Sequence, residues 1–85
     1  MYRVILVAAV NKKEARRIAK GLINSKLAAC VNIIGGIESC FWWKGKIDSA
    51  KEVLLIIKSR KEKVSKVIKL VVPPGALFPL YVAIA

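Results

Sequence analysis

The chain has 85 residues, enough for one domain, and 56% of them are apolar; sixteen Lys and Arg against five Asp and Glu give a net charge of +11. Its apolar runs are too short to span a bilayer, the start Met1-Tyr2-Arg3 lacks a signal-peptide pattern, and two cysteines do not make a disulfide framework. We therefore expect a single domain over residues 1–85, in the cytoplasm, with free thiols and no membrane partner.

The N-terminal third predicts a strand and then an amphipathic helix. Residues 2–10 are apolar without alternation, as in a strand covered on both faces. Asn11 stands at an N-cap position with Glu14 three residues on, as in a capping box. Apolar residues at helical spacing predict a helix over residues 12–25. Its other face is basic and carries Lys12, Lys13, Arg16, Arg17 and Lys20.

The rest of the chain predicts strands at residues 28–34, 37–43 and 52–58, a helix at 61–71 and a last strand at 78–85. Gly35-Gly36 indicates a bulge or sharp bend, Lys44-Gly45-Lys46 a hairpin connection, and Pro73-Pro74-Gly75 the end of the second helix. The order βαββαβ is that of an α+β ferredoxin-like fold, an antiparallel sheet with two helices on one face, here with a long bent hairpin.

The strands are apolar on both faces, whereas two helices can cover only one face of the sheet. The uncovered face must be buried by something, because large apolar patches rarely stay exposed to water. A second copy of the chain supplies such a surface, so we predict a homo-oligomer.

Two motifs in this element order resemble the CutA divalent-cation-tolerance family. They are LAACVNI (residues 27–33) and SCFWWKGKI (residues 39–47), followed by Glu52 and a strand ending at Lys58-Ser59. The resemblance extends over residues 2–72. It implies a small cytosolic, ferredoxin-like protein without catalytic activity that forms a compact homotrimer and is linked to tolerance of copper and other divalent cations.

The C-terminal segment departs from the family pattern. Members carry a His-Pro-Tyr-x-x-Pro-Glu segment, and here Pro74, Ala76 and Leu80 stand at the histidine, tyrosine and glutamate positions. Members also continue beyond the fourth strand, whereas this sequence ends at Ala85. No ligand role of that histidine or glutamate passes to this chain.

Cys30 is the candidate metal ligand. The resemblance places it among residues suspected of binding copper, and a thiol suits Cu(I). The alternative is a small packing residue, since a free cysteine is among the most buried residue types. One sulfur makes a poor site, although a threefold axis would bring three copies together. Cys40 lies outside the family pattern, and we interpret it as incidental.

Phe41, Trp42 and Trp43 are candidate interface anchors, because aromatic residues are enriched in subunit interfaces. Strand alternation places Trp42 and Trp43 on opposite faces. With Lys44 and Lys46 beside them, the aromatic rings also fit base stacking, which is the alternative.

The polar residues point to no reaction. The sequence has no histidine, no P-loop and no nucleophile elbow, and we expect Glu38, Asp48 and Glu52 to pair with lysines. We predict a protein that is not an enzyme and has no certain cofactor, with copper as the candidate metal. The competing hypothesis is a trimer, similar to the PII signalling proteins, that binds an anionic small molecule or nucleic acid through its basic helices. Nucleic acid is the less expected partner, because no base-reading module is recognisable.

Overall fold

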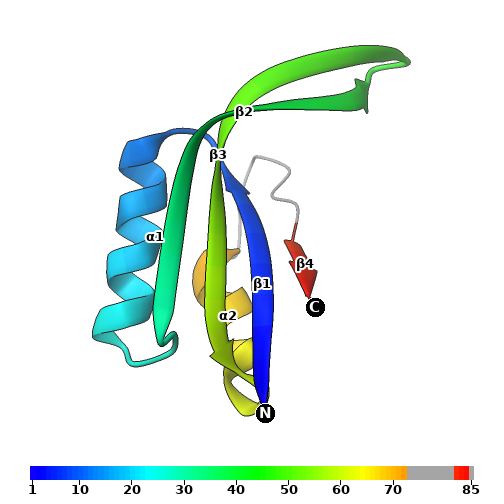
Figure 1. Cartoon of the computed structure of the whole chain (residues 1–85). Coiled ribbons are helices and arrows are strands. Elements are labelled where there is room, and N and C mark those ends of the chain that lie inside the picture. The colour runs from blue at the N-terminus through cyan, green and yellow to red at the C-terminus, as the bar shows by residue number, and fades with distance from the viewer. Residues whose placement is uncertain (73–81, 85) are drawn as a thin grey trace.

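The computed structural model describes residues 1–72 and 82–84. Its elements are β1 (Tyr2–Ala9), α1 (Lys12–Asn24), β2 (Cys30–Trp43), β3 (Lys46–Arg60), a short 3₁₀ helix η1 (Lys61–Lys63), α2 (Val64–Val71) and β4 (Val82–Ile84) (Figure 1). The strands form one antiparallel sheet in the order β2-β3-β1-β4. Both helices pack on the same face of the sheet, so the chain has the predicted ferredoxin-like α+β fold.

The hydrophobic core lies between the sheet and the two helices. The odd-numbered residues of β1 and β3 point into it, because strand side chains alternate between faces. The buried set consists of Ile5, Val7, Ala9, Val53, Leu55 and Ile57 from the strands, with Ala15, Ile18, Leu22, Val67 and Val71 from the helices. Each fully buried aliphatic side chain contributes about 1.5–3 kcal/mol relative to an exposed one.

Helix α1 begins and ends with recognisable capping. The side-chain oxygen of Asn11 accepts a hydrogen bond from the Glu14 backbone N–H at 2.8 Å, as predicted. At the other end the Leu27 N–H bonds to the Leu22 carbonyl, and the Lys26 N–H to the Ile23 carbonyl. This is a Schellman motif, and Lys26 holds its left-handed position with φ of 57°.

The β2–β3 hairpin is longer than the sequence predicted. β3 begins at Lys46, not at residue 52, and pairs with β2 from Trp43↔Lys46 to Cys30↔Lys58. Lys44 and Gly45 have φ of 51° and 78°, which fits the two-residue type I′ turn that joins twisted strands. The far part of the hairpin, residues 37–52, projects beyond the sheet as an arm (Figure 1).

The remaining differences lie in the C-terminal third. The predicted helix 61–71 divides into η1 and α2. β4 (Val82–Ile84) lies within the strand predicted at 78–85, and the rest of that range lies outside the described residues. The predicted stop at Pro73-Pro74-Gly75 and the departures at Pro74, Ala76 and Leu80 lie outside the described residues. Among the described helices, none combines the length and the apolar character needed to cross a bilayer.

Candidate functional site

The face of the sheet opposite the helices is apolar along its centre. Residues that oppose each other in an antiparallel ladder share a face, so the strand register determines which side chains lie there. The set consists of Val4, Leu6 and Ala8 from β1, Leu54, Ile56 and Lys58 from β3, and Cys30, Asn32 and Ile34 from β2. We call these nine residues the open face, because both described helices pack on the other side.

A bulge in β2 changes which residues continue this face into the arm. Ile34 opposes Leu54 and Ile37 opposes Glu52, so β2 uses one residue more than β3 between the two pairs. Gly36 has φ of 75°, a backbone conformation that glycine adopts at little cost. The bulge predicted at Gly35-Gly36 is therefore present. After the bulge, the odd-numbered residues of β2 lie on the side of the hairpin that the even-numbered residues of β2 occupy before the bulge.

The aromatic residues of the arm are divided between its two sides. Phe41 and Trp43 lie on the side that continues the open face, and Trp42 lies on the opposite side, as strand alternation predicted. Trp42 is 72% exposed, and its cross-strand partner Ile47 is 70% exposed. The Lys44 ammonium lies 6.0 Å from the centre of the Trp43 ring. Exposed apolar side chains gathered in this way are typical of a contact surface, and the interface role of Phe41, Trp42 and Trp43 stays a prediction.

The two cysteines are not brought together. Cys30 is half-buried on the open face and opposes Lys58, and its sulfur lies 4.0 Å from the Asn32 side-chain oxygen. Cys40 is exposed on the opposite side of the arm, where it opposes Ser49. They are ten positions apart on β2, so the bent strand separates them by at most about 33 Å.

The described part of one chain does not fit a metal ion. Across residues 1–72 and 82–84, no three His, Cys, Asp or Glu side chains lie close enough to hold one. The residue opposite Cys30 is a lysine, whose charge repels cations. A metal site at Cys30 therefore needs donors from other copies of the chain.

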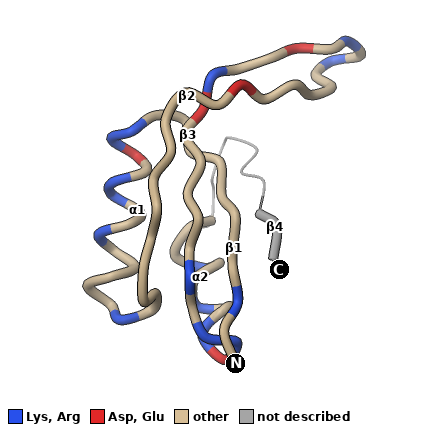
Figure 2. Tube along the Cα trace, viewed as in Figure 1, with Lys and Arg blue, Asp and Glu red and all other residues tan. Residues whose placement is uncertain are grey.

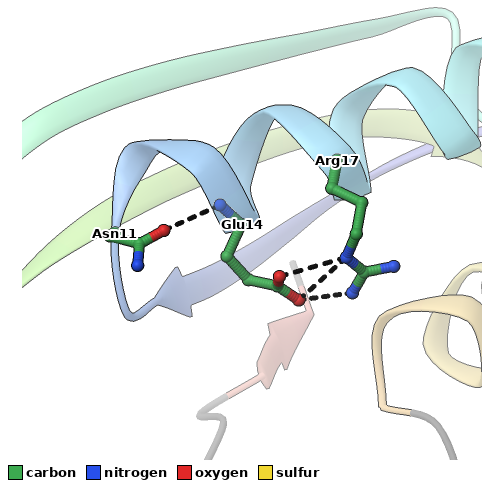
Figure 3. A network of polar contacts seen from close by, with 3 residues as sticks. All are labelled: Asn11, Glu14 and Arg17. Carbon is green, nitrogen blue, oxygen red and sulfur yellow. Dashed lines mark hydrogen bonds and ion pairs between the residues drawn. The ribbon is translucent and has the colours of Figure 1, made fainter.

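The basic face of α1 is largely uncompensated. The Arg17 guanidinium donates hydrogen bonds to the Glu14 carboxylate (Figure 3), which lowers the pKa of Glu14 and raises the pKa of Arg17 from their ordinary values. This is the one ion pair among the described residues. The prediction that Glu38, Asp48 and Glu52 pair with lysines is thus wrong. The carboxylate of Asp48 instead accepts the Ser49 N–H at 2.8 Å.

The fold and the site together define a class of protein: a ferredoxin-like domain whose sheet has one face under helices and one apolar face open, extended by an aromatic arm. The chain belongs to the CutA1 divalent ion tolerance protein family, whose sequence profile matches residues 3–73.

Relatives and solved structures agree with this membership. A "Divalent-cation tolerance protein CutA" of Archaeoglobus fulgidus is 51% identical over 67 residues, which are 79% of this chain and 65% of that protein. The protein of the same name from Thermus thermophilus is 34% identical over 94% of this chain and 84% of its own length. The Archaeoglobus structure, described as "Periplasmic divalent cation tolerance protein CutA", superposes with a TM-score of 0.85 at 40% identity over 100% of this chain and 82% of that one.

Several relatives are much longer than the region matched. "Protein CutA 1, chloroplastic" of rice is 52% identical over 58 residues, which are 68% of this chain and 33% of the rice protein. The matched region thus spans about a third of the plant protein and about two thirds of the Archaeoglobus protein.

Proposed function

We propose that this chain is a non-catalytic, homotrimeric protein of divalent-cation tolerance. The observation that carries the proposal is the open apolar face of the sheet, continued by Phe41 and Trp43 of the arm. Leu6 and Ile56 would lie at the centre of the contact between copies. The number three rests on the family resemblance, and the link to cation tolerance rests on the names of the relatives.

The assembly is tested by light scattering coupled to gel filtration at micromolar concentration. We expect a mass three times the 9.3 kDa of one chain. Trp42→Ser and Phe41→Ser test the two sides of the arm separately, and each is expected to weaken the assembly if its side contacts a neighbour. A mass near 9.3 kDa for the unaltered protein would contradict the proposal.

Copper is the metal that we propose for this chain, bound as Cu(I) by Cys30 thiolates from several copies. Sulfur ligands favour Cu(I), whereas Cu(II) prefers nitrogen and oxygen donors, and the sequence has no imidazole. Thiols lose a proton when they bind a metal, so the apparent affinity should rise with pH. Assembly is required, because within the described residues one chain gathers no group of three metal-binding side chains at Cys30.

The two cysteines provide a matched pair of variants for this test. In competition titrations with a Cu(I) chelator, Cys30→Ser should lose the tight site and Cys40→Ser should keep it. Each variant is compared at the same oligomeric mass, so that loss of assembly is not mistaken for loss of a ligand. Equal affinity in Cys30→Ser and the unaltered protein would make Cys30 a packing residue.

A second candidate function is binding of an anionic molecule through the basic helices. Of the five basic residues on α1, only Arg17 has an acidic partner among the described residues (Figures 2 and 3). Such binding should weaken steeply with salt and should not depend on base sequence if the partner is a nucleic acid. A fluorescence titration at two salt concentrations tests it, and sequence-selective binding at physiological salt would contradict it.

We also propose that the chain works in the cytoplasm, a proposal that rests on the family resemblance. Cell fractionation with an antibody against the protein tests this proposal. Recovery in the periplasm, the compartment named for the Archaeoglobus relative, would contradict it.

A further inference from the structure

A cavity of ≈ 230 Å³ lies at the end of the sheet far from the arm. It is bounded by the loop that follows α1, by the end of β3 and by η1, close to the N-terminus. Figure 2 shows Lys and Arg gathered in this region. Tyr2, Lys26 and Arg60 are exposed at its rim, so the cavity is open to solvent.

Three cations from three different elements line this cavity. Lys26 comes from the loop after α1, Arg60 is the last residue of β3, and Lys63 ends η1. No carboxylate pairs with any of the three within the described residues, where the ion pair is Glu14–Arg17. Like charges around one hollow repel each other, and this repulsion is reduced when an anion binds among them.

Two of the three cations, Lys63 and Arg60, make contacts within the chain and still keep donors available. The Lys63 ammonium gives one hydrogen bond to the Lys26 carbonyl at 2.7 Å, which leaves two of its three donors. The Arg60 guanidinium carbon lies 5.9 Å from the centre of the Tyr2 ring, and no acceptor in the described residues takes its five N–H groups. The planar guanidinium fits two oxygens of a phosphate or carboxylate at once.

Helix capping explains only part of this arrangement. The C-terminus of α1 carries partial negative charge, which accounts for Lys63 bonded to the Lys26 carbonyl. It does not account for Arg60, which belongs to β3. Nor does it explain why a lysine occupies the left-handed position of the Schellman motif, where glycine is favoured and another residue costs about 1–2 kcal/mol.

We propose that this cavity is a binding site for a phosphoryl group, carried by inorganic phosphate or by a small phosphate ester. The charge of about −1.5 to −2 that a phosphate monoester has at pH 7 matches three cations better than a carboxylate does. The cavity has room for about seven waters at ~30 Å³ each, so an ester with a small apolar body also fits. Ile23, Leu27 and Ala28 supply apolar surface for such a body. The site is independent of the assembly and metal proposals, since it contains neither an arm residue nor Cys30.

The test titrates the full-length protein with inorganic phosphate and with phenyl phosphate, while amide shifts are followed by NMR. We expect the shifts to concentrate at residues 26–29 and 59–63. Tighter binding of phenyl phosphate would identify the ester as the preferred source of the phosphoryl group, and equal binding would identify free phosphate. The absence of shifts at millimolar ligand would overturn the proposal.

Matched double variants separate the cavity from general attraction by a basic protein. Arg60→Gln/Lys63→Gln removes two cavity cations, and Lys46→Gln/Lys51→Gln removes two exposed cations from the arm, far from the cavity. We expect the first to weaken phosphate binding by about tenfold or more, because it removes charge-assisted hydrogen bonds. The second should change it by less than about twofold in physiological salt.

Equal weakening in the two double variants, or none in the cavity variant, would overturn the proposal. Arg60→Gln alone serves if the double variant is poorly folded, because the Arg60 side chain makes no hydrogen bond to another described residue. Circular dichroism melting of each variant confirms that the binding is compared between folded proteins.

Discussion

Replacing Gly36 with alanine should destabilise the protein, whereas the same replacement at Gly35 should be nearly neutral. Gly36 has φ of 75°, and a Cβ placed there would meet no atom within 4 Å. The cost of Gly36→Ala is therefore conformational and not steric. A left-handed conformation costs a non-glycine residue about 1–2 kcal/mol. Alanine also restricts the unfolded chain, which offsets about 0.4–1 kcal/mol of that cost, so a net loss of about 1 kcal/mol is expected.

Gly35 is the matched control in the same bulge. Its φ is not in the left-handed region, and a Cβ would approach the Lys12 side-chain Cε at 2.7 Å. That atom belongs to the far end of a flexible chain, which can move away at little cost. We expect Gly35→Ala to change the free energy of unfolding by no more than about 0.5 kcal/mol.

Thermal unfolding followed by circular dichroism, at one fixed protein concentration, measures both changes. For a domain of this size a loss of 1 kcal/mol lowers Tm by about 4–8 °C, so Gly36→Ala should show this shift and Gly35→Ala should not. Gly36→Asn should fall between them, because asparagine tolerates the left-handed region. Equal Tm values for the two alanine variants would refute the assignment of the backbone strain to Gly36.

Four further results are expected. Asn11→Ala should destabilise the protein by about 1 kcal/mol through loss of the N-cap. Asn11→Ser should keep most of the stability in the same melting assay, because a serine hydroxyl can also cap the helix. Glu14→Gln should lower the free energy of unfolding by less than about 1 kcal/mol at neutral pH, because an exposed ion pair such as Glu14–Arg17 adds little to stability. Because the folded-state pKa of Glu14 is lowered, the ionised carboxylate stabilises the fold above the ordinary glutamate pKa, and this stabilisation is lost as the pH falls through the lowered pKa. A difference in Tm between Glu14→Gln and the unaltered protein that persists in stronger acid would contradict this. Leu55→Ala should lose about 2–5 kcal/mol of stability by opening a cavity in the core. Ile56→Lys, one residue along on the open face, should leave the chain folded and reduce its mass in light scattering.

The order of the elements could be predicted because local patterns determine it. The apolar spacing of α1, the cap at Asn11 and the glycines at 35 and 36 each act within a few residues of themselves. The length of β3 could not be predicted in this way. Residues 46–51 read KIDSAK, and they bury no regular face from which a strand period could be recognised. They are a strand because residues 38–43 of β2 lie opposite them.

The candidate site was only partly visible for a related reason. Alternation along one strand correctly separated Trp42 from Trp43. It did not relate either of them to Cys30, because a bulge reverses the alternation and Gly35-Gly36 indicated either a bulge or a sharp bend. The cavity was missed entirely, since its residues are far apart in the sequence. Tyr2 and Arg60 meet only when β1 pairs with β3, and Lys26 joins them only when the loop after α1 packs beside η1. A lysine at the usual glycine position after α1 was the signal that could have drawn attention to it.

The type I′ turn at Lys44-Gly45 limits how the arm can vary in length among related chains. Adding one residue to each strand would move the turn outward and exchange the two sides at the tip, so that Trp42 and Trp43 would change places. Lengthening that preserves the sides must add residues to each strand in pairs, and each pair extends the arm by about 6.6 Å. The reach of the arm is thus quantised in steps of that size, and chains whose arms differ by an odd number of residues in each strand would present opposite sides at the tip and should be unable to assemble with each other.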